Sequence, residues 1–449
     1  MITRQHRLAV GMCALSLSAA CGGRSQPSMS PVPVATAADS NAGWWRGFGL
    51  PALDTLVDAA LKNSPDIQLS IARLAEARAK MRGTNANWDP SVSPTASYTR
   101  SEQVIGNFGA ISTTVASVST TASWELDLFG RLRKERAAGV ADGITAAYDA
   151  ADVRRTTVAE IARVYFDVLS TSHEVAVLEA QRMARGTARS LEASRARVGL
   201  NGGSDSLRAD GDERNVLVQL TTVRARRAEL LADLAALTGS SIMWVDSVVA
   251  LTARLEVRVQ VPENGIPADW LRLRPDVRAA ESRVVAAAAR VEAAKRALRP
   301  SLSLAGSTGR NRTNESSWVP TWSFGPSLAI NVPTRAGRAQ VSVRQAQLSQ
   351  REIEWRQAVR DAASDVEVAF ARVREFEERL KRQRESVSGY QAMVSLSQSR
   401  FTSGLADYRA VLDDQRTLLE AERTHVEYWT AYAKAVVTLM QATGAPEVR

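Results

Sequence analysis

Few side chains of the kinds that carry out chemistry occur in this chain. Of its 449 residues, two are cysteines and three are histidines. Cys13 and Cys21 both lie near the N-terminus, while His173 and His425 lie far apart in stretches with helical periodicity. The sequence has no ligand spacing of a zinc site, no phosphate-binding glycine loop and no convincing catalytic triad. We therefore predict no catalytic, metal or cofactor site, and we expect that the protein is not an enzyme.

Cys21 is the side chain for which we expect covalent chemistry. Two arginines precede a mostly apolar run over residues 8–20, and this run ends in small residues, which is typical of a secretory signal peptide. Bacterial lipoproteins carry their lipid anchor on a cysteine at this position, usually with leucine three residues earlier, where this chain has Ser18. We predict a signal peptide over residues 1–20 and diacylation (palmitate-type lipidation) of Cys21, with ordinary cleavage nearby as the alternative.

The composition is that of an ordinary folded protein. Hydrophobic residues make up 45% of the chain and charged residues 23%, so extensive disorder is not expected. The net charge of +9 comes from arginines that are scattered among acidic residues, which favours solvated helix faces over a nucleic-acid-binding stripe. Beyond the N-terminal run, no stretch reaches the ~18–20 consecutive apolar residues of a membrane-spanning helix.

The stretch Trp124–Arg131 marks a change from one periodicity to another. Before it, apolar and polar residues alternate, which places them on opposite faces of a β-strand. After Gly130 the pattern becomes helical, and no proline occurs before Pro262. A strand that leads into a very long helix indicates a β-barrel wall continuing into a helical tube. The apolar set is Ala116, Val118, Ala122, Trp124, Leu126 and Leu128, and the polar set is Ser117, Ser119, Thr121, Ser123, Glu125 and Asp127.

Landmarks recur at offsets of about 204–210 residues, which indicates an internal duplication. Pro275-Asp276 corresponds to Pro65-Asp66, and Gly404-Leu405 corresponds to Gly199-Leu200. Each copy reads as helix, strand, strand, long helix and returning helix. A proline-free helix over residues 131–198 would reach about 100 Å at ~1.5 Å per residue. The apolar seams predicted for the long helices are Val158, Ile161, Tyr165 and Val168 in the first copy, and Trp355, Val359, Ala362, Val366, Ala369, Val373, Phe376 and Leu380 in the second.

These patterns divide the chain into five segments. After the signal peptide we expect a lipid-anchored tether over residues 21–50, a first repeat over 51–240, a connecting equatorial segment over 241–268 and a second repeat over 269–449. The predicted connections between the strands of each pair are Glu102–Ser112 and Arg310–Pro320.

Four strands with one polar and one apolar face cannot close a barrel, and open sheet edges are not tolerated in lipid. Spanning barrels have at least about eight strands, so several chains would each have to contribute four. A soluble β-sandwich with one wet face is the alternative, but such a domain has no use for ~100 Å helices. The predicted fold class is an internally duplicated α+β membrane protein with four transmembrane strands and long periplasmic coiled helices.

The chain resembles the TolC-like outer-membrane efflux factors, in the lipoprotein branch that includes OprM and NodT types. The resemblance covers nearly all of the mature chain. It rests on Trp44-Trp45 with Phe48, Trp124–Arg131, Arg274-Pro275-Asp276 with Ala280-Glu281, Gly325-Pro326 and Arg400–Arg416. The chain departs from the family pattern before Gly337, where phenylalanine is usual and this sequence reads Pro333-Thr334-Arg335-Ala336.

The resemblance implies a homotrimer with a twelve-stranded barrel in the outer membrane and a twelve-helix tunnel through the periplasm. It implies a passive exit duct of a tripartite efflux or secretion system, which docks to a periplasmic adaptor (membrane fusion) protein and receives substrates from an inner-membrane pump. A lipid-anchored periplasmic coiled-coil rod or adaptor is the alternative, but it leaves the four amphipathic strands without a purpose.

The resemblance also implies where functional residues lie. Asp413 falls on the family's gate aspartate, with Asp414 beside it and Arg409 four residues earlier on the same helix face. We expect Asp413 carboxylates to ring the closed periplasmic mouth and Arg409 to pair with them; an ordinary solvated ion pair is the alternative. The barrel lumen is expected to be lined by residues including Glu125, Asp127 and Asn331. The expected adaptor contacts at the helical tips are Val198, Gly199, Leu200, Phe401, Gly404 and Leu405.

Overall fold

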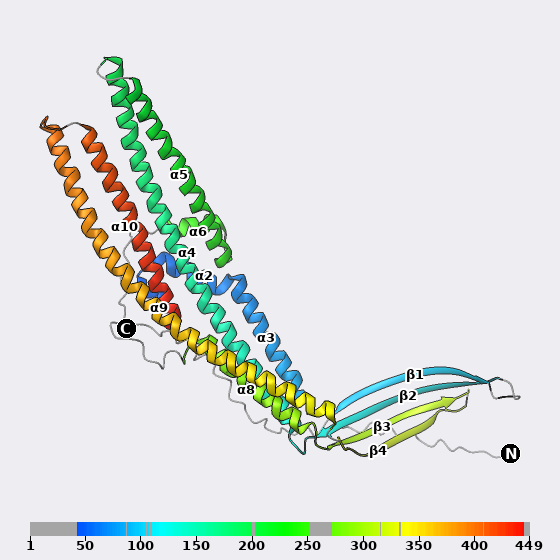
Figure 1. The fold of residues 1–449 in the computed structure, drawn as a ribbon. Coiled ribbons are helices and arrows are strands. Elements are labelled where there is room, and N and C mark those ends of the chain that lie inside the picture. Colours follow the sequence, from blue (N-terminus) through cyan, green and yellow to red (C-terminus); the bar gives the residue numbers. More distant parts are fainter. Residues whose placement is uncertain are drawn as a thin grey trace, which may run out of the picture.

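The protein is an elongated molecule in which long helical hairpins extend from one end of a four-stranded sheet (Figure 1). The computed structural model describes residues 43–86, 88–104, 106, 110–199, 203–250, 272–314, 316–331, 334–406 and 408–443. Cys21, the signal peptide, Leu200 and most of the predicted connecting segment lie outside the described residues.

The first half of the chain builds one strand pair and one long helical hairpin. A short 3₁₀ helix, η2, precedes two helices that lead into the sheet, and the long helix α4 leaves it. The returning helix α5 ends beside α2, and α6 follows it. The elements are η2 (Trp44–Phe48), α2 (Pro51–Asn63), α3 (Pro65–Ala86), β1 (Ser91–Val104), β2 (Ala110–Leu126), α4 (Arg131–Arg197), α5 (Gly203–Thr238) and α6 (Ile242–Val249).

The second half repeats this order of helix, strand, strand, long helix and returning helix, as the spaced landmarks predict. The long helix α9 packs against α8 and α10, and α10 also contacts α4 of the first half (Figure 1). The elements are α8 (Pro275–Arg296), β3 (Ser301–Thr313), β4 (Val319–Ala329), α9 (Arg335–Thr402) and α10 (Tyr408–Thr443).

The sheet has the strand order β1-β2-β3-β4, with every neighbouring pair antiparallel. The strands extend further than the sequence predicts, because ladder pairing continues to Val104 and Ala110 in one pair and to Asn311 and Val319 in the other. Both predicted connections are therefore too long. Residues that extend the strands include Glu102, Gln103 and Arg310, which are polar, so polarity alone did not mark the ends of these strands.

The predicted alternation is confirmed by the register across all four strands. Ser93 pairs with Thr121, Thr121 pairs with Ser307, and Ser307 pairs with Ser323, so the polar face of one strand continues on the next. The opposite face carries apolar side chains in the same way. These include Val92, Tyr98, Val118, Trp124, Trp322, Phe324 and Leu328, which are 40–81% exposed in the single chain.

The long helices form where the proline-free stretches predict them. α4 has 67 residues and α9 has 68, so each extends about 100 Å. The predicted seam of α4 is buried, from Val158 at 2% exposed to Val168 at 0%. In α9 the seam residues Ala362, Val366, Ala369, Val373 and Leu380 are buried. Phe376 is half-buried and Trp355 is 36% exposed, so the seam covers less of the helix than predicted.

No single helix among the described residues is both long and apolar enough to cross a membrane. Two consecutive helical segments, Ser206–Thr238 and Ile242–Val249, are long and apolar enough only when they are taken together, and the chain bends by 107° between them.

An aromatic cluster joins the N-terminal segment to the two hairpins. Phe166 of α4 lies 5.3 Å from Phe48 and 5.7 Å from Trp429 of α10, between ring centroids. Trp44 contacts Phe48 edge-on at 6.1 Å. Tilted and edge-on pairs of this kind contribute beyond their buried area. The Trp44-Trp45 motif is thus a packing element that fixes η2 against the helices.

We predict that Phe166→Ala destabilises the protein by about 3–5 kcal/mol, because the ring is fully buried between two aromatic partners. Denaturant unfolding of the purified protein measures this difference. Met243→Ala serves as the control, since Met243 is 82% exposed and its truncation should change the free energy of unfolding by no more than about 0.5 kcal/mol. Equal effects of the two substitutions would contradict the assigned packing role.

Candidate channel wall and gate

Most side chains on the polar face of the sheet carry hydroxyl groups. Ser97 and Ser117 hydroxyl oxygens lie 2.8 Å apart between β1 and β2, and Ser307 and Ser323 repeat this contact between β3 and β4. Such cross-strand hydroxyl pairs stabilise the ladder and leave acceptors and donors free for water. A wall of this chemistry suits a water-filled passage with little preference for the charge of what passes.

Glu125 and Asp127 lie where β2 ends and α4 begins. The Asp127 carboxylate accepts hydrogen bonds from the backbone N–H groups of Leu132 and Arg133, both at 3.0 Å, which caps the first turn of α4. Its side chain is only 3% exposed. Glu125 forms a bidentate ion pair with Arg131 at 2.7–2.8 Å. Both carboxylates therefore hold the joint between strand and helix, and a lumen-lining role for them remains a prediction.

Gly130 makes this joint sterically possible. Its φ of +76° lies in the left-handed region, and a Cβ there would collide with the guanidinium of Arg296. That guanidinium donates to the carbonyls of Phe129 and Gly130 at 3.2 and 3.1 Å, which ties α8 to the start of α4.

The second joint, between β4 and α9, uses different side chains for the same purpose. Asn331 donates from Nδ2 to the carbonyls of Ala297 and Arg299 at 3.2 and 3.3 Å. Thr334 caps α9 by accepting a hydrogen bond from the N–H of Gly337 at 3.1 Å. Asn331 is thus anchored to the end of α8, and its predicted place in the lumen lining is untested.

The two helical hairpins reverse through glycines at their far ends. Gly404 has φ +72°, and the N–H groups of Gly404 and Leu405 donate to the carbonyls of Phe401 and Arg400 at 2.9 and 2.8 Å. This bonding pattern is a Schellman motif, which satisfies the last carbonyls of α9. Gly199 ends α4 with φ +74°. Val198 and Leu405 are 70% and 79% exposed, so both tips present apolar side chains to solvent.

The predicted gate residues lie in the first two turns of α10, next to the second tip. Asp413 is exposed and Asp414 is half-buried. The Arg409 side chain lies outside the described part of the structure, so its expected pairing with Asp413 stays a prediction. Within the described part of the protomer, Asp413 makes no ion pair.

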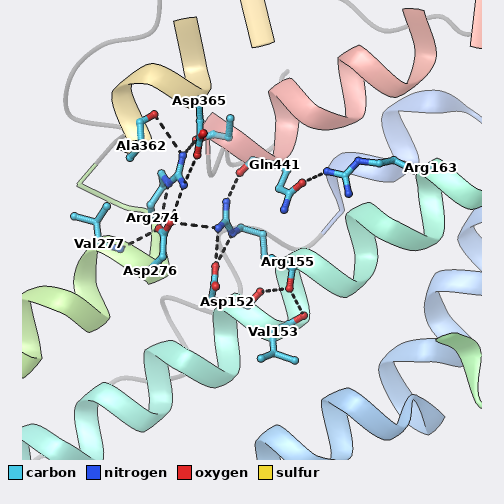
Figure 2. A network of polar contacts seen from close by, with 12 residues as sticks. Asp152, Val153, Arg155, Arg163, Arg274, Asp276, Val277, Ala362, Asp365 and Gln441 are labelled. Atoms are coloured by element: carbon cyan, nitrogen blue, oxygen red, sulfur yellow. Dashed lines mark hydrogen bonds and ion pairs between the residues drawn. The ribbon is translucent and has the colours of Figure 1, made fainter. Parts of the chain in front are cut away.

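A network of buried arginines holds the opposite end of α10 (Figure 2). Arg274, 4% exposed, precedes α8 and donates to the carbonyl of Ala442 at 3.0 Å. It also donates to the carboxylates of Asp276 at 2.7 Å and Asp365 at 3.1 Å. Carbonyls of the last turn of a helix lack intrahelical partners, so a cationic donor is favoured there. The Arg274-Pro275-Asp276 motif therefore caps α10.

Arg155 of α4 provides a second cap for α10. It donates to the carbonyl of Gln441, and it pairs with Asp152 at 2.6 Å and with Asp276 at 3.7 Å (Figure 2). Arg163 donates to the side-chain oxygen of Gln441. Sequence reasoning missed these residues, because nothing in local spacing distinguishes Arg155 from the other arginines of α4.

Opposing effects act on the Asp276 carboxyl. Burial raises its pKa, but hydrogen bonds and charge from Arg274, together with the charge of Arg155, outweigh burial, so the pKa lies below its ordinary value. The ionised form therefore prevails at neutral pH, and both arginines pair with this carboxylate.

His173 and His425 face an open pocket of about 530 Å³ between α4, α9 and α10. Burial lowers the pKa of His173, and the nearby carboxylate of Glu422 opposes this effect. Burial also lowers the pKa of His425, with further lowering from the charges of Arg384 and His173. Among the described residues no group of three or more potential metal ligands occurs here or elsewhere.

We predict that Arg274→Met costs about 3–5 kcal/mol of stability, because it removes the buried donor of the Ala442 carbonyl and one of the two arginines that pair with Asp276. Arg278→Met, one turn later on α8, is the matched control; its ion pair with Glu281 is solvent-exposed and should contribute less than about 1 kcal/mol. Thermal or denaturant unfolding of both purified variants gives the comparison, and similar losses would argue against the capping role.

We expect acid to destabilise the helical hairpins through the two histidines. Their folded-state pKa values lie below that of an unfolded histidine, so the unfolded chain binds protons first and stability falls as the pH drops through about 6.5. Unfolding midpoints measured between pH 8 and pH 5 should show this loss, and the double variant His173→Gln, His425→Gln should show a smaller one. An unchanged slope in the variant would exclude the histidines as its cause.

Comparisons with known proteins find matches to both halves of the chain. The family described as outer membrane efflux protein matches residues 56–240 and 266–445. The chain is 28% identical over 391 residues to the probable efflux pump outer membrane protein TtgC of Pseudomonas putida, covering 81% of this chain and 77% of the relative. It is 27% identical over 390 residues to nodulation protein T of Rhizobium leguminosarum bv. viciae, covering 82% and 78%.

The fold is also similar to that of solved structures. The outer-membrane channel OprN superposes with a TM-score of 0.75 at 24% sequence identity, over 90% of this chain and 92% of OprN. The likeness to OprN shows a shared fold, and the family match spans both halves of the chain. The chain therefore belongs to the outer membrane efflux protein family.

Proposed function

We propose that three copies of this chain form a continuous channel that serves as the exit duct of a tripartite efflux system. The observation that carries this proposal is the four-stranded sheet with one polar face, one apolar face and two open edges, β1 and β4. Lipid does not tolerate unpaired edges, and pairing β4 of one copy with β1 of the next removes them. Three copies supply twelve strands, which is within the range of known barrels.

The helices supply the rest of the duct. At about 100 Å, α4 and α9 are long enough to extend the passage well beyond a bilayer of roughly 40–45 Å. The protomer exposes apolar side chains on α9, such as Ile353 and Leu396. Packing of copies side by side would bury these side chains against the neighbouring copy. Lipidation of Cys21 adds a second attachment to the outer membrane in this proposal.

The far tips are the proposed docking points for a periplasmic adaptor, which in turn brings an inner-membrane pump. Val198 and Gly199 on one tip and Phe401, Gly404 and Leu405 on the other are the described residues of this surface. Relatives named as efflux pump outer membrane proteins support this class of partner. A polar serine-rich wall imposes little selection, so the pump and adaptor decide which substrates are carried.

The proposed gate is a ring of three Asp413 carboxylates at the narrow periplasmic mouth. Like charges held together in a constriction repel one another and favour cations over anions. The alternative function, a periplasmic lipid-anchored rod or adaptor, has no channel and therefore no gate, so conductance separates the two.

We predict that Asp413→Ala enlarges single-channel openings by about twofold or more and weakens cation preference, because it removes the ring of charge. Planar-bilayer recordings of the purified full-length oligomer measure both properties. Asp233→Ala is the control. Asp233 is an exposed carboxylate near the C-terminal end of α5, far from the helical tips, so its substitution should leave conductance unchanged. Unaltered openings in Asp413→Ala would move the gate elsewhere, and no openings from a verified oligomer would favour the rod.

A further inference from the structure

Three arginines lie on the apolar face of the sheet, all toward the end that is distant from the helices. Arg100 is on β1, and Arg310 and Arg312 are on β3. The register assigns their face, because Arg312 pairs with Ala116, which pairs with Tyr98. Arg310 similarly lies between Val118 and Pro320. These side chains therefore share the face of Tyr98, Val118 and Trp322, and not the face of the serine ladder.

The position of the arginines along the strands places them at one membrane interface. Arg100 follows Val92 by eight residues, and Arg310 and Arg312 follow Leu302 by eight and ten. At ~3.3 Å per residue and a strand tilt of ~40°, this separation is about 20–25 Å along the membrane normal. The apolar band of a spanning barrel is about 25 Å tall, so the arginines lie at its far edge.

The charges on this face are unbalanced in favour of the cations. Within the described strands, Glu102 is the one carboxylate on the face, and these arginines are its only basic residues. Arg310 and Arg100 are exposed and pair with no described carboxylate. Arg312 is half-buried, with its guanidinium 5.6 Å from the Trp318 ring centroid. This cation–π contact holds Arg312 at the level of the aromatic side chains.

Within the described strands, the helix-side end of the same face has no such cations. Its side chains are those of Val92, Trp124, Leu302 and Leu328. A cationic patch at one end only is suited to a membrane whose two leaflets differ in charge. Guanidinium groups bind phosphate oxygens in a bidentate geometry, and their aliphatic stems tolerate the edge of an apolar layer.

We propose that Arg100, Arg310 and Arg312 form a belt that binds the phosphate groups of lipids in the outer leaflet of the outer membrane. The proposal rests on the membrane-spanning role of the sheet given above. The recognised chemistry is a phosphorylated lipid headgroup, held by guanidinium forks beside the rings of Trp318 and Trp322. Such binding fixes the depth and orientation of the barrel, because only one leaflet offers the ligand.

The test measures lipid binding to the purified full-length oligomer in neutral detergent by native mass spectrometry. The probes are diphosphoryl lipid A and the same lipid with both phosphates removed. Wild type should prefer the phosphorylated form. The triple variant Arg100→Gln, Arg310→Gln, Arg312→Gln should weaken binding of the phosphorylated lipid by about tenfold or more and leave the dephosphorylated lipid unaffected.

Two further variants separate charge from geometry. The triple Arg→Lys variant keeps the positive charge but lacks the bidentate guanidinium geometry. Its affinity for the phosphorylated lipid should therefore fall between those of wild type and the glutamine variant. Glu102→Gln removes the opposing charge from the same face and should bind the phosphorylated lipid at least as tightly as wild type. Equal binding of both lipids by wild type, or no loss in the glutamine variant, would overturn the belt. Planar-bilayer conductance of each variant tests the channel itself, so failure of the belt is distinguishable from failure of the proposed function.

Discussion

The unpaired backbone groups at the two sheet edges are the constraint on which the rest of the structure depends. β1 and β4 each present a row of N–H and C=O groups with no partner strand in the described chain. In hydrocarbon each unsatisfied group costs several kcal/mol, so a single copy is unstable in a bilayer. Assembly is therefore a condition for insertion, and the duplication of the chain supplies two strand pairs already in register for it.

The joints between strands and helices fix the helices to the sheet. Each strand pair ends in a capped helix, through Asp127 on α4 and Thr334 on α9, while Arg296 and Asn331 tie α8 to both joints. The two joints use different side chains although the halves share one plan. The duplication has thus preserved the geometry of the connection rather than its residues, because any donor or acceptor that satisfies a helix end serves equally well.

The sequence predicted the fold well where the signal was periodic or repeated. The alternation around Trp124, the proline-free helices and the glycine reversals all depend on local backbone preference, and the structure confirms them. The polar network could not be predicted in the same way, because Arg155 and Gln441 meet only after α4 and α10 pack. Asp127 appeared to continue the polar face of β2, whereas the ladder ends at Leu126 and frees Asp127 to cap a helix.

The two ends of α10 are held very differently, and this difference limits how the proposed gate at Asp413 can move. Its last turn accepts hydrogen bonds from Arg155 and Arg274, and its C-terminal half is buried around Trp429 and Val436. Its first turns follow an exposed glycine reversal with few buried neighbours, and Asp413 is exposed there. Displacing the buried end breaks charge-assisted bonds, while displacing the tip breaks few contacts. A pivot about the arginine network is therefore the motion of α10 that breaks the fewest contacts, and it displaces the first turns, which carry Asp413, more than the buried end.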